Sequence, residues 1–147
     1  MNLYKQNAAT QEDILRLFSE CDFEPKLESY VDTGVYTQKI LTNAERFECW
    51  IDDKLTGLVA LYANDTKSHL SFITMVCVGR DFGGRGIATA LLGQAISHAR
   101  DGHFTSIELE VYSTNDLATR LYERLGFVKI KNDSDKILMS LNLLEKS

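Results

Sequence analysis

The chain has 147 residues, 44% of them hydrophobic and 25% charged, which is an ordinary composition for a globular protein with a substantial core. Its net charge of −5 excludes the global basic field of a nucleic-acid-binding protein, and no apolar run is long enough to span a membrane. Because no basic, apolar leader opens the chain either, we expect one cytoplasmic domain over residues 1–147, with neither nucleic acid nor membrane as a partner.

The three cysteines, Cys21, Cys49 and Cys77, are far apart in the sequence. An odd number without a close pair argues against a disulfide framework and against a zinc site. Cys49 and Cys77 lie in apolar, strand-like runs, which favours buried thiols. We therefore expect no metal.

The first part of the chain is predicted to be mainly helical after one short strand. Thr10 is a good N-cap, and acidic residues follow it in the first turn. The pattern between residues 20 and 36 is irregular around Pro25, which makes this stretch a candidate substrate-binding region. The expected elements are a strand over 2–6, a helix after Thr10, a short helix over 26–31 and a helix over 35–42.

From Arg46 onward the hydrophobic period becomes that of strands, and later alternates with that of helices. The expected elements are strands over 47–51, 55–63 and 69–78, a helix over 85–100, a strand over 105–112, a helix to residue 125 capped by Ser113 or Asn115, and strands over 127–131 and 136–143. The helical crossover should make the strand over 105–112 parallel to that over 69–78. The fold class is α/β (α+β), with a mixed, mostly antiparallel sheet of six to seven strands and about four helices.

A glycine-rich loop joins the third of these strands to the following helix. Gly83, Gly84 and Gly86 let backbone N–H groups approach a ligand, and the helix N-terminus adds unpaired donors and a positive dipole end. A phosphate-bearing ligand is therefore expected. The loop lacks the Lys-Ser/Thr pair of a nucleoside triphosphate P-loop.

The same loop matches a dinucleotide-binding fingerprint only in part. Thr89 stands where the third glycine belongs, while Glu108 could supply the acid about twenty residues later. A meander of strands precedes the loop, whereas that fingerprint opens the first strand–helix unit. An NAD-dependent oxidoreductase remains an alternative on these residues.

A second motif lies in the stretch from Leu109 to Phe127. The pattern Asn-x-x-Ala-x-x-Leu-Tyr-x-x-x-Gly-Phe is filled by Asn115, Ala118, Leu121, Tyr122, Gly126 and Phe127. Together with the loop from Gly83 to Ala88, it resembles the GCN5-related N-acetyltransferase (GNAT) family, whose loop reads Gln/Arg-x-x-Gly-x-Gly/Ala. The Leu-Glu-Val opening is similar to that of the ribosomal-protein alanine N-acetyltransferases in this family. The resemblance in element order covers about residues 46–143.

One position departs from the family pattern. Gly83 replaces the usual Gln or Arg, which removes a side chain from the loop but leaves its backbone N–H. Arg85 or Arg80 could supply positive charge there.

The resemblance implies acetyl coenzyme A (acetyl-CoA) as cosubstrate and a primary amine as acceptor. Its pyrophosphate would bind the backbone of Gly83, Gly84, Arg85, Gly86, Ile87 and Ala88. Its pantetheine arm would pair with the backbone of Val76, Cys77 and Val78, where the two parallel strands must part. Asn115 would bond to the pantetheine or to atoms on the adenine side.

The resemblance also implies the catalytic groups. Glu110 would be the general base, directly or through water, and Tyr122 the general acid for the departing thiolate. An N–H such as that of Val78 would stabilise the oxyanion. Each side chain also has a structural interpretation, with Glu110 as a solvated strand carboxylate and Tyr122 as a core residue; Glu108 is the second choice for the base.

The sequence therefore predicts an N-acetyltransferase that works by direct attack in a ternary complex, as a monomer or homodimer. The acceptor stays open among a protein N-terminus, an amino sugar and a small amine. An alternative function is a non-catalytic acyl-CoA-binding sensor or interaction module on the same fold. The aromatics Tyr30, Tyr36, Phe47 and Trp50 either line an acceptor pocket or belong to the core, and the core is the preferred interpretation.

Overall fold

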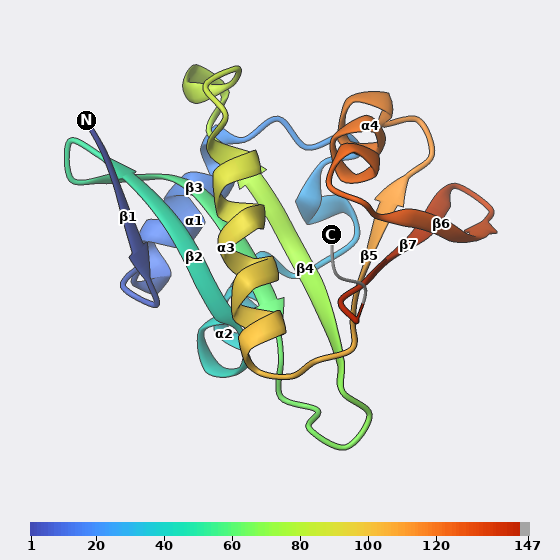
Figure 1. Ribbon diagram of the computed structural model, residues 1–147. Coiled ribbons are helices and arrows are strands. Elements are labelled where there is room, and N and C mark those ends of the chain that lie inside the picture. Colours follow the sequence, from blue (N-terminus) through green and yellow to red (C-terminus); the bar gives the residue numbers. More distant parts are fainter. Residues whose placement is uncertain (145–147) are drawn as a thin grey trace.

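The computed structural model describes residues 1–144, which form a seven-stranded sheet with four α-helices and two 3₁₀ helices (Figure 1). In chain order the elements are β1 (Asn2–Gln6), α1 (Gln11–Glu20), the 3₁₀ helix η1 (Leu27–Ser29), α2 (Thr33–Asn43), β2 (Glu45–Ile51), β3 (Lys54–Tyr62), β4 (Leu70–Val78), the 3₁₀ helix η2 (Arg80–Phe82), α3 (Ile87–Asp101), β5 (Ser106–Tyr112), α4 (Asp116–Arg124), β6 (Val128–Asp133) and β7 (Lys136–Asn142). The strand order is β1-β2-β3-β4-β5-β7-β6. Only β4 and β5 are parallel, so the predicted mixed, mostly antiparallel sheet is confirmed.

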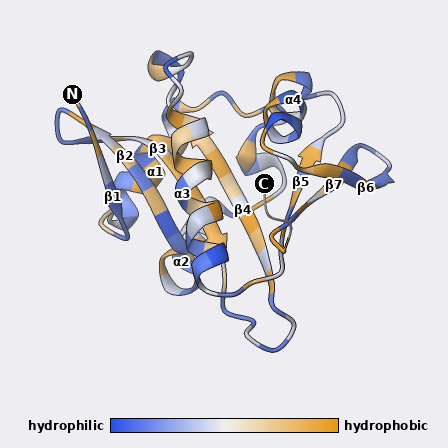
Figure 2. Cartoon of the chain, viewed as in Figure 1, coloured by the Kyte–Doolittle hydropathy of each residue, from blue (hydrophilic) through white to orange (hydrophobic). Residues whose placement is uncertain are grey.

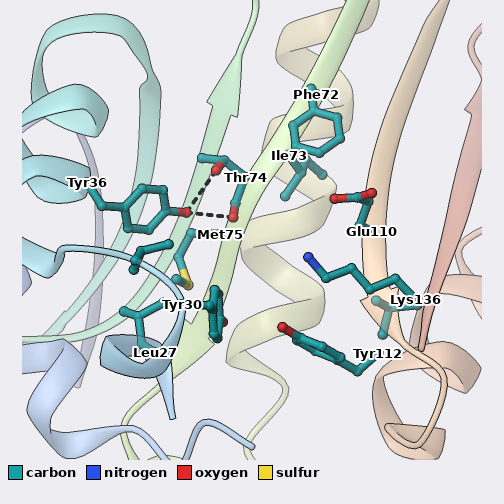
Figure 3. A pocket seen from close by; sticks show the side chains of 12 residues that line it. Leu27, Tyr30, Tyr36, Phe72, Ile73, Thr74, Met75, Glu110, Tyr112 and Lys136 are labelled. Atoms are coloured by element: carbon teal, nitrogen blue, oxygen red, sulfur yellow. Dashed lines mark hydrogen bonds between the residues drawn. The ribbon is translucent and has the colours of Figure 1, made fainter. Parts of the chain in front are cut away.

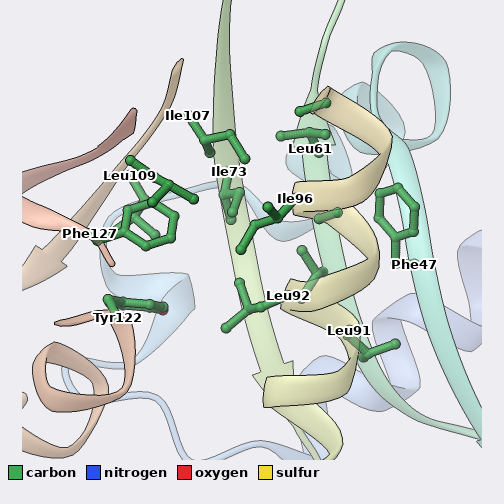
Figure 4. Packing of buried hydrophobic residues seen from close by; sticks show 14 of the residues in the cluster. Phe47, Leu61, Ile73, Leu91, Leu92, Ile96, Ile107, Leu109, Tyr122 and Phe127 are labelled. Atoms are coloured by element: carbon green, nitrogen blue, oxygen red, sulfur yellow. The ribbon is translucent and has the colours of Figure 1, made fainter. Parts of the chain in front are cut away.

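Two apolar clusters pack on opposite faces of the sheet. On one face, α3 and α4 contribute residues such as Leu92, Ile96 and Tyr122, which pack with Ile73 and Leu109 of the strands (Figure 4). The other face is covered by α1 and α2, whose buried side chains pack on β3 and on the later part of β4. In Figure 2 the strands behind α3 are largely orange, as expected for a sheet that is buried on both faces.

A buried carboxylate holds the start of α1 against the sheet. Glu48 on β2 is fully buried and accepts hydrogen bonds from the backbone N–H groups of Ala8 and Ala9 and from the indole of Trp50. It also forms an ion pair with Arg46 at 3.4 Å. This network fixes the start of α1 over the face of the sheet on which α1 packs against β3.

Two helices begin at residues other than those expected. The helix predicted from residue 85 begins at Ile87, because Gly86 has a left-handed φ of +78° and forms the N-cap. The helix predicted from residue 35 begins at Thr33, because the Asp32 carboxylate caps it by accepting the Val35 N–H. Within residues 1–144, no helix combines the length and apolar character needed to cross a bilayer.

The parallel pair β4 and β5 is joined over only four residue pairs. Leu70–Ile73 pair with 106–109, and beyond these positions the two strands diverge toward the start of α3 (Figure 1). A β-bulge at Thr74 shifts the register of β4 against β3 at the same point. The Tyr36 hydroxyl donates to the Thr74 carbonyl at 2.7 Å and holds the bulge from the α2 side. The strands therefore part as expected, and the resulting gap is called the β4–β5 opening below.

Candidate active site

The loop at the end of β4 presents a run of unpaired backbone donors. Within residues 1–144, the N–H groups of residues 83–89 donate no hydrogen bond, and the first bond of α3 runs from Ala90 N–H to the Gly86 carbonyl. Gly84 and Gly86 have φ values of +76° and +78°, which side-chain-bearing residues rarely adopt. Donors of this kind at the N-terminus of a 15-residue helix suit an anionic ligand.

Gly83 differs from the other two glycines of this loop. Its φ of −67° and ψ of 156° are ordinary extended values, and a Cβ at this position would meet no atom within 4 Å. Of the two nearby cations, Arg80 is paired with Asp22 at 3.0 Å, while the Arg85 guanidinium lies 5.1 Å from the Phe82 ring centre. The backbone at residue 83 therefore does not require glycine.

Alternate residues of β4 direct their backbone N–H and C=O groups toward the opening. The Gly79 N–H donates to the Thr56 carbonyl of the preceding strand at 2.9 Å. Hydrogen-bonded and non-hydrogen-bonded pairs alternate along an antiparallel ladder, so the neighbouring pair Val78–Gly57 is of the second kind. The N–H and C=O groups of Val78, and by the same alternation those of Val76, therefore point toward the opening.

Cys77 occupies a different position from its two neighbours. Its backbone belongs to the ladder with β3, and its thiol is buried in the cluster under α1. The adjacent Cys21 thiol and burial raise the pKa of Cys77 well above its usual value. A thiol that keeps its proton is a poor nucleophile, so the environment argues against an acyl-enzyme at Cys77.

Asn115 lies beside this part of β4. Its side chain accepts the Ala118 N–H at 3.2 Å and so caps α4, which decides between the two predicted caps, Ser113 and Asn115. Together with Val76, Cys77, Val78 and Tyr112, it lines a cavity of about 240 Å³ that also contacts the segment from Cys21 to Pro25. Asn115 can therefore contact a ligand in the opening while its oxygen caps the helix.

Glu110 faces a second cavity, of about 370 Å³, on the α1–α2 face of the sheet (Figure 3). Its neighbours Leu109 and Val111 point to the opposite face, so the carboxylate is exposed and directed into the cavity. Within residues 1–144 it forms no hydrogen bond or ion pair with another side chain. Tyr30 and Tyr112 line both cavities, so the two spaces meet at the β4–β5 opening.

Tyr122 approaches the opening from the other face. It is 7% exposed, packs 5.9 Å from the Phe127 ring, and extends from α4 toward β4 (Figure 4). Burial, with a smaller contribution from Cys77, raises the pKa of Tyr122 to about 12, so the hydroxyl keeps its proton at neutral pH. The carboxylate and the phenol thus lie on opposite faces of the sheet.

The aromatic residues divide between site and core. Phe47 and Trp50 are 3% and 7% exposed and belong to the core. The core interpretation is wrong for Tyr30, which is exposed and lines the larger cavity. Tyr36 fits both interpretations, because it packs against the core beside Phe18 and also lines this cavity. Sequence reasoning also missed Lys136, at the start of β7, which lines the same cavity without any motif to indicate it. Among the residues described, no cluster of three His, Cys, Asp or Glu side chains could hold a metal ion.

Comparison with known proteins identifies the family. The model of the acetyltransferase (GNAT) family matches residues 11–127. An uncharacterized N-acetyltransferase of Methanocaldococcus jannaschii is 38% identical over 85 residues, which are 55% of this chain and 38% of that protein. The chain spans less than half the length of the curated relatives it matches.

Solved structures show the same fold at low sequence identity. The ribosomal-protein-S18-alanine N-acetyltransferase of Escherichia coli superposes with a TM-score of 0.81 at 18% identity, covering 100% of this chain and 97% of that one. The PaiA N-acetyltransferase of Thermoplasma acidophilum, solved with coenzyme A, gives 0.77 at 15% identity and covers 95% and 99%. On the strength of the family match, the chain belongs to the acetyltransferase (GNAT) family.

Proposed function

We propose that the protein is an N-acetyltransferase that moves the acetyl group of acetyl-CoA to a primary amine in a ternary complex. The observation that carries this proposal is the β4–β5 opening. It lies between the end of β4, which leads into a loop of N–H donors, and a cavity that contains the Glu110 carboxylate; within residues 1–144 neither these donors nor this carboxylate has a hydrogen-bond partner. A ligand held at the loop and an amine held in the cavity would meet within the sheet.

The residues around the loop fit the phosphate-bearing end of acetyl-CoA. The N–H groups of residues 83–89 would hold the pyrophosphate at the positive end of the α3 dipole. The backbone of Val76 and Val78 would pair with the amides of the pantetheine arm, as in the addition of a strand. Asn115 lines the same space and would contact this arm.

The chemistry needs two proton transfers and the stabilisation of one developing charge, and the site offers one group for each. Glu110, directly or through water, takes the proton that the amine must lose as its nitrogen bonds to the acetyl carbon. The Val78 N–H donates to the carbonyl oxygen, on which negative charge develops. When the carbon–sulfur bond breaks, Tyr122 gives its proton to the sulfur. Burial near Tyr122 also raises the proton affinity of the departing sulfur, because it disfavours the charged thiolate. The difference in proton affinity between the Tyr122 phenol and this sulfur is therefore reduced.

Release of coenzyme A over a panel of amines tests the proposal. Glu110→Gln and Tyr122→Phe should each lower kcat by roughly 10²- to 10⁴-fold, the usual range for a lost acid or base. Glu123→Gln and Tyr4→Phe are matched controls, because these exposed residues lie on α4 and β1 and line neither cavity. Both controls should retain wild-type turnover.

Other outcomes would contradict specific parts of the proposal. Unchanged turnover in both site variants would remove the catalytic assignments, and a loss confined to Glu108→Gln would move the base to Glu108. Binding of acetyl-CoA without coenzyme A release for any amine would identify a non-catalytic acyl-CoA sensor. Calorimetric binding of NAD without binding of coenzyme A would favour the oxidoreductase.

A further inference from the structure

The cavity that contains Glu110 also contains a cation. The ammonium of Lys136 lies 5.3 Å from the ring centre of Tyr112 and 5.9 Å from that of Tyr30. In Figure 3 it points into the cavity, on the same side as the Glu110 carboxylate. Within residues 1–144, no carboxylate forms an ion pair with Lys136. A partly buried cation beside two aromatic rings therefore forms no ion pair in the described part of the chain, although the Glu110 carboxylate lines the same cavity.

The fold fixes the position of this cation. Lys136 is the first residue of β7 and lies opposite Tyr112 in the β5–β7 ladder. The preceding turn is tied to the residue after β5 by a hydrogen bond from the Ser113 N–H to the Asp135 carbonyl at 2.8 Å. The two tyrosine ring centres are 6.0 Å apart and lie on one side of the ammonium, and their attraction for a cation favours its position at the cavity.

A fixed cation limits which amines the cavity can accept. An amine with an ordinary pKa arrives positively charged, so a second ammonium on the acceptor would be repelled by Lys136. A carboxylate on the acceptor would instead form a charge-assisted hydrogen bond with it. The cavity is otherwise apolar on the side of Leu27, Val31 and Met75, which suits an uncharged hydrocarbon group.

We propose that the acceptor is an amine that also carries a carboxylate, with Lys136 as the residue that selects the carboxylate and Glu110 facing the amine. This inference rests on the proposed function. The volume of about 370 Å³ equals that of roughly a dozen water molecules, which is the scale of a small molecule. The carboxylate could belong to a free α-amino acid with an apolar side chain or to an acidic residue next to a peptide N-terminus.

The test compares L-leucine with L-leucinamide, which differ only in the carboxylate. The ratio of their kcat/KM values is measured in the wild type and in Lys136→Met. Differences in amine basicity cancel between the two proteins, so a change of ratio reports the contact with Lys136. A hydrogen bond to a charged group predicts that the preference for leucine falls by roughly 10- to 100-fold in Lys136→Met.

Three further variants make the test specific. Lys136→Arg retains the charge and should retain the preference, whereas Lys136→Glu should shift it toward a diamine such as cadaverine. Lys131→Met removes an exposed cation of β6 that does not line the cavity, and should behave as the wild type. Equal melting temperatures across the set would show that the variants fold alike.

A second substrate pair identifies the source of the carboxylate. Leucyl-glutamate amide is compared with leucyl-glutamine amide in the same proteins. A Lys136-dependent preference in this pair and not in the leucine pair assigns the carboxylate to a peptide, and the reverse assigns it to a free amino acid.

Failure of this inference can be told apart from failure of the proposed function. If coenzyme A is released but Lys136→Met leaves both ratios unchanged, the inference is wrong and the proposed function stands. If no amine supports release, the proposed function fails, and calorimetry with L-leucine then decides the inference. Binding to the wild type that is lost in Lys136→Met supports the carboxylate site, and equal or absent binding overturns it.

Discussion

Replacing Gly83 with glutamine tests whether the loop after β4 binds its ligand through backbone donors. The φ of −67° at this residue is accessible to any side chain, and a Cβ would meet no atom within 4 Å. The substitution should therefore cause no strain, and loss of glycine freedom in the unfolded chain should stabilise the protein by about 0.4–1 kcal/mol. A glutamine amide can add one hydrogen bond to the pyrophosphate, worth about 0.5–1.5 kcal/mol. We expect acetyl-CoA affinity equal to that of the wild type or up to about tenfold higher.

The same substitution at Gly84 or Gly86 is the matched comparison. Their φ values of +76° and +78° would cost a side-chain-bearing residue about 1–2 kcal/mol. The loop can relieve this strain only by rotating its N–H groups away from the ligand. The affinity for acetyl-CoA should then fall by roughly 5- to 30-fold, because a cost of about 1–2 kcal/mol changes the dissociation constant by this factor.

Calorimetric titration with acetyl-CoA and thermal unfolding together measure both effects. Gly83→Gln should match or exceed the wild type in each measurement, and Gly86→Gln should be weaker in binding. A large loss of affinity in Gly83→Gln at an unchanged melting temperature would refute the reasoning. It would mean that the loop has been aligned to the wrong position of the family motif.

Three further predictions concern the scaffold. Glu48→Ala should lower the free energy of unfolding by about 3–5 kcal/mol, because the Arg46 guanidinium stays buried without its Glu48 partner. Urea unfolding measures this change, and a loss below about 1 kcal/mol would contradict the prediction. Gly57→Ala places a Cβ 2.7 Å from Ile87 Cγ2, so overpacking of α3 on β3 should lower the free energy of unfolding by about 1–3 kcal/mol. An unchanged free energy of unfolding would show that α3 shifts easily. The raised pKa of Tyr122, about 12 against 10.0 unfolded, means that the native state retains a proton that the unfolded chain loses. The contribution of this residue to the free energy of unfolding is therefore complete below pH 10 and is lost as the pH rises to about 12. In Tyr122→Phe the free energy of unfolding should fall less steeply between these pH values. An equally steep fall in this variant would assign the loss to other tyrosines.

The elements and the class of sheet could be predicted because local signals specify them. The change of hydrophobic period at Arg46 separates the helical start from the strands, and Thr10 and Asn115 cap the helices that follow them. The crossover rule correctly made β4 and β5 parallel. Helix starts were less certain because they depend on single residues, such as the left-handed Gly86.

The composition of the larger cavity could not be predicted, because it depends on contacts between distant parts of the chain. Tyr30 follows an irregular segment without periodicity, and Lys136 belongs to a hairpin near the other end of the chain. Alternation did indicate that Glu110 points away from the face of Leu109 and Val111, but not that a cavity lies there. For Tyr122, burial on the apolar stripe of α4 is compatible with both a core and a catalytic role, and the kinetics of Tyr122→Phe distinguish the two.

The short ladder between β4 and β5 also has a mechanical consequence. Within residues 1–144, four ladder pairs and a hydrogen bond from the Thr105 N–H to the His69 carbonyl join the two parts of the sheet through the backbone, and all lie at one end of the boundary. Side-chain packing holds the rest of the boundary. Apolar contacts are non-directional, and they tolerate small displacements that would break a hydrogen-bonded ladder. The wide end of this boundary should therefore depend on the packing of side chains and not on backbone hydrogen bonds for its separation.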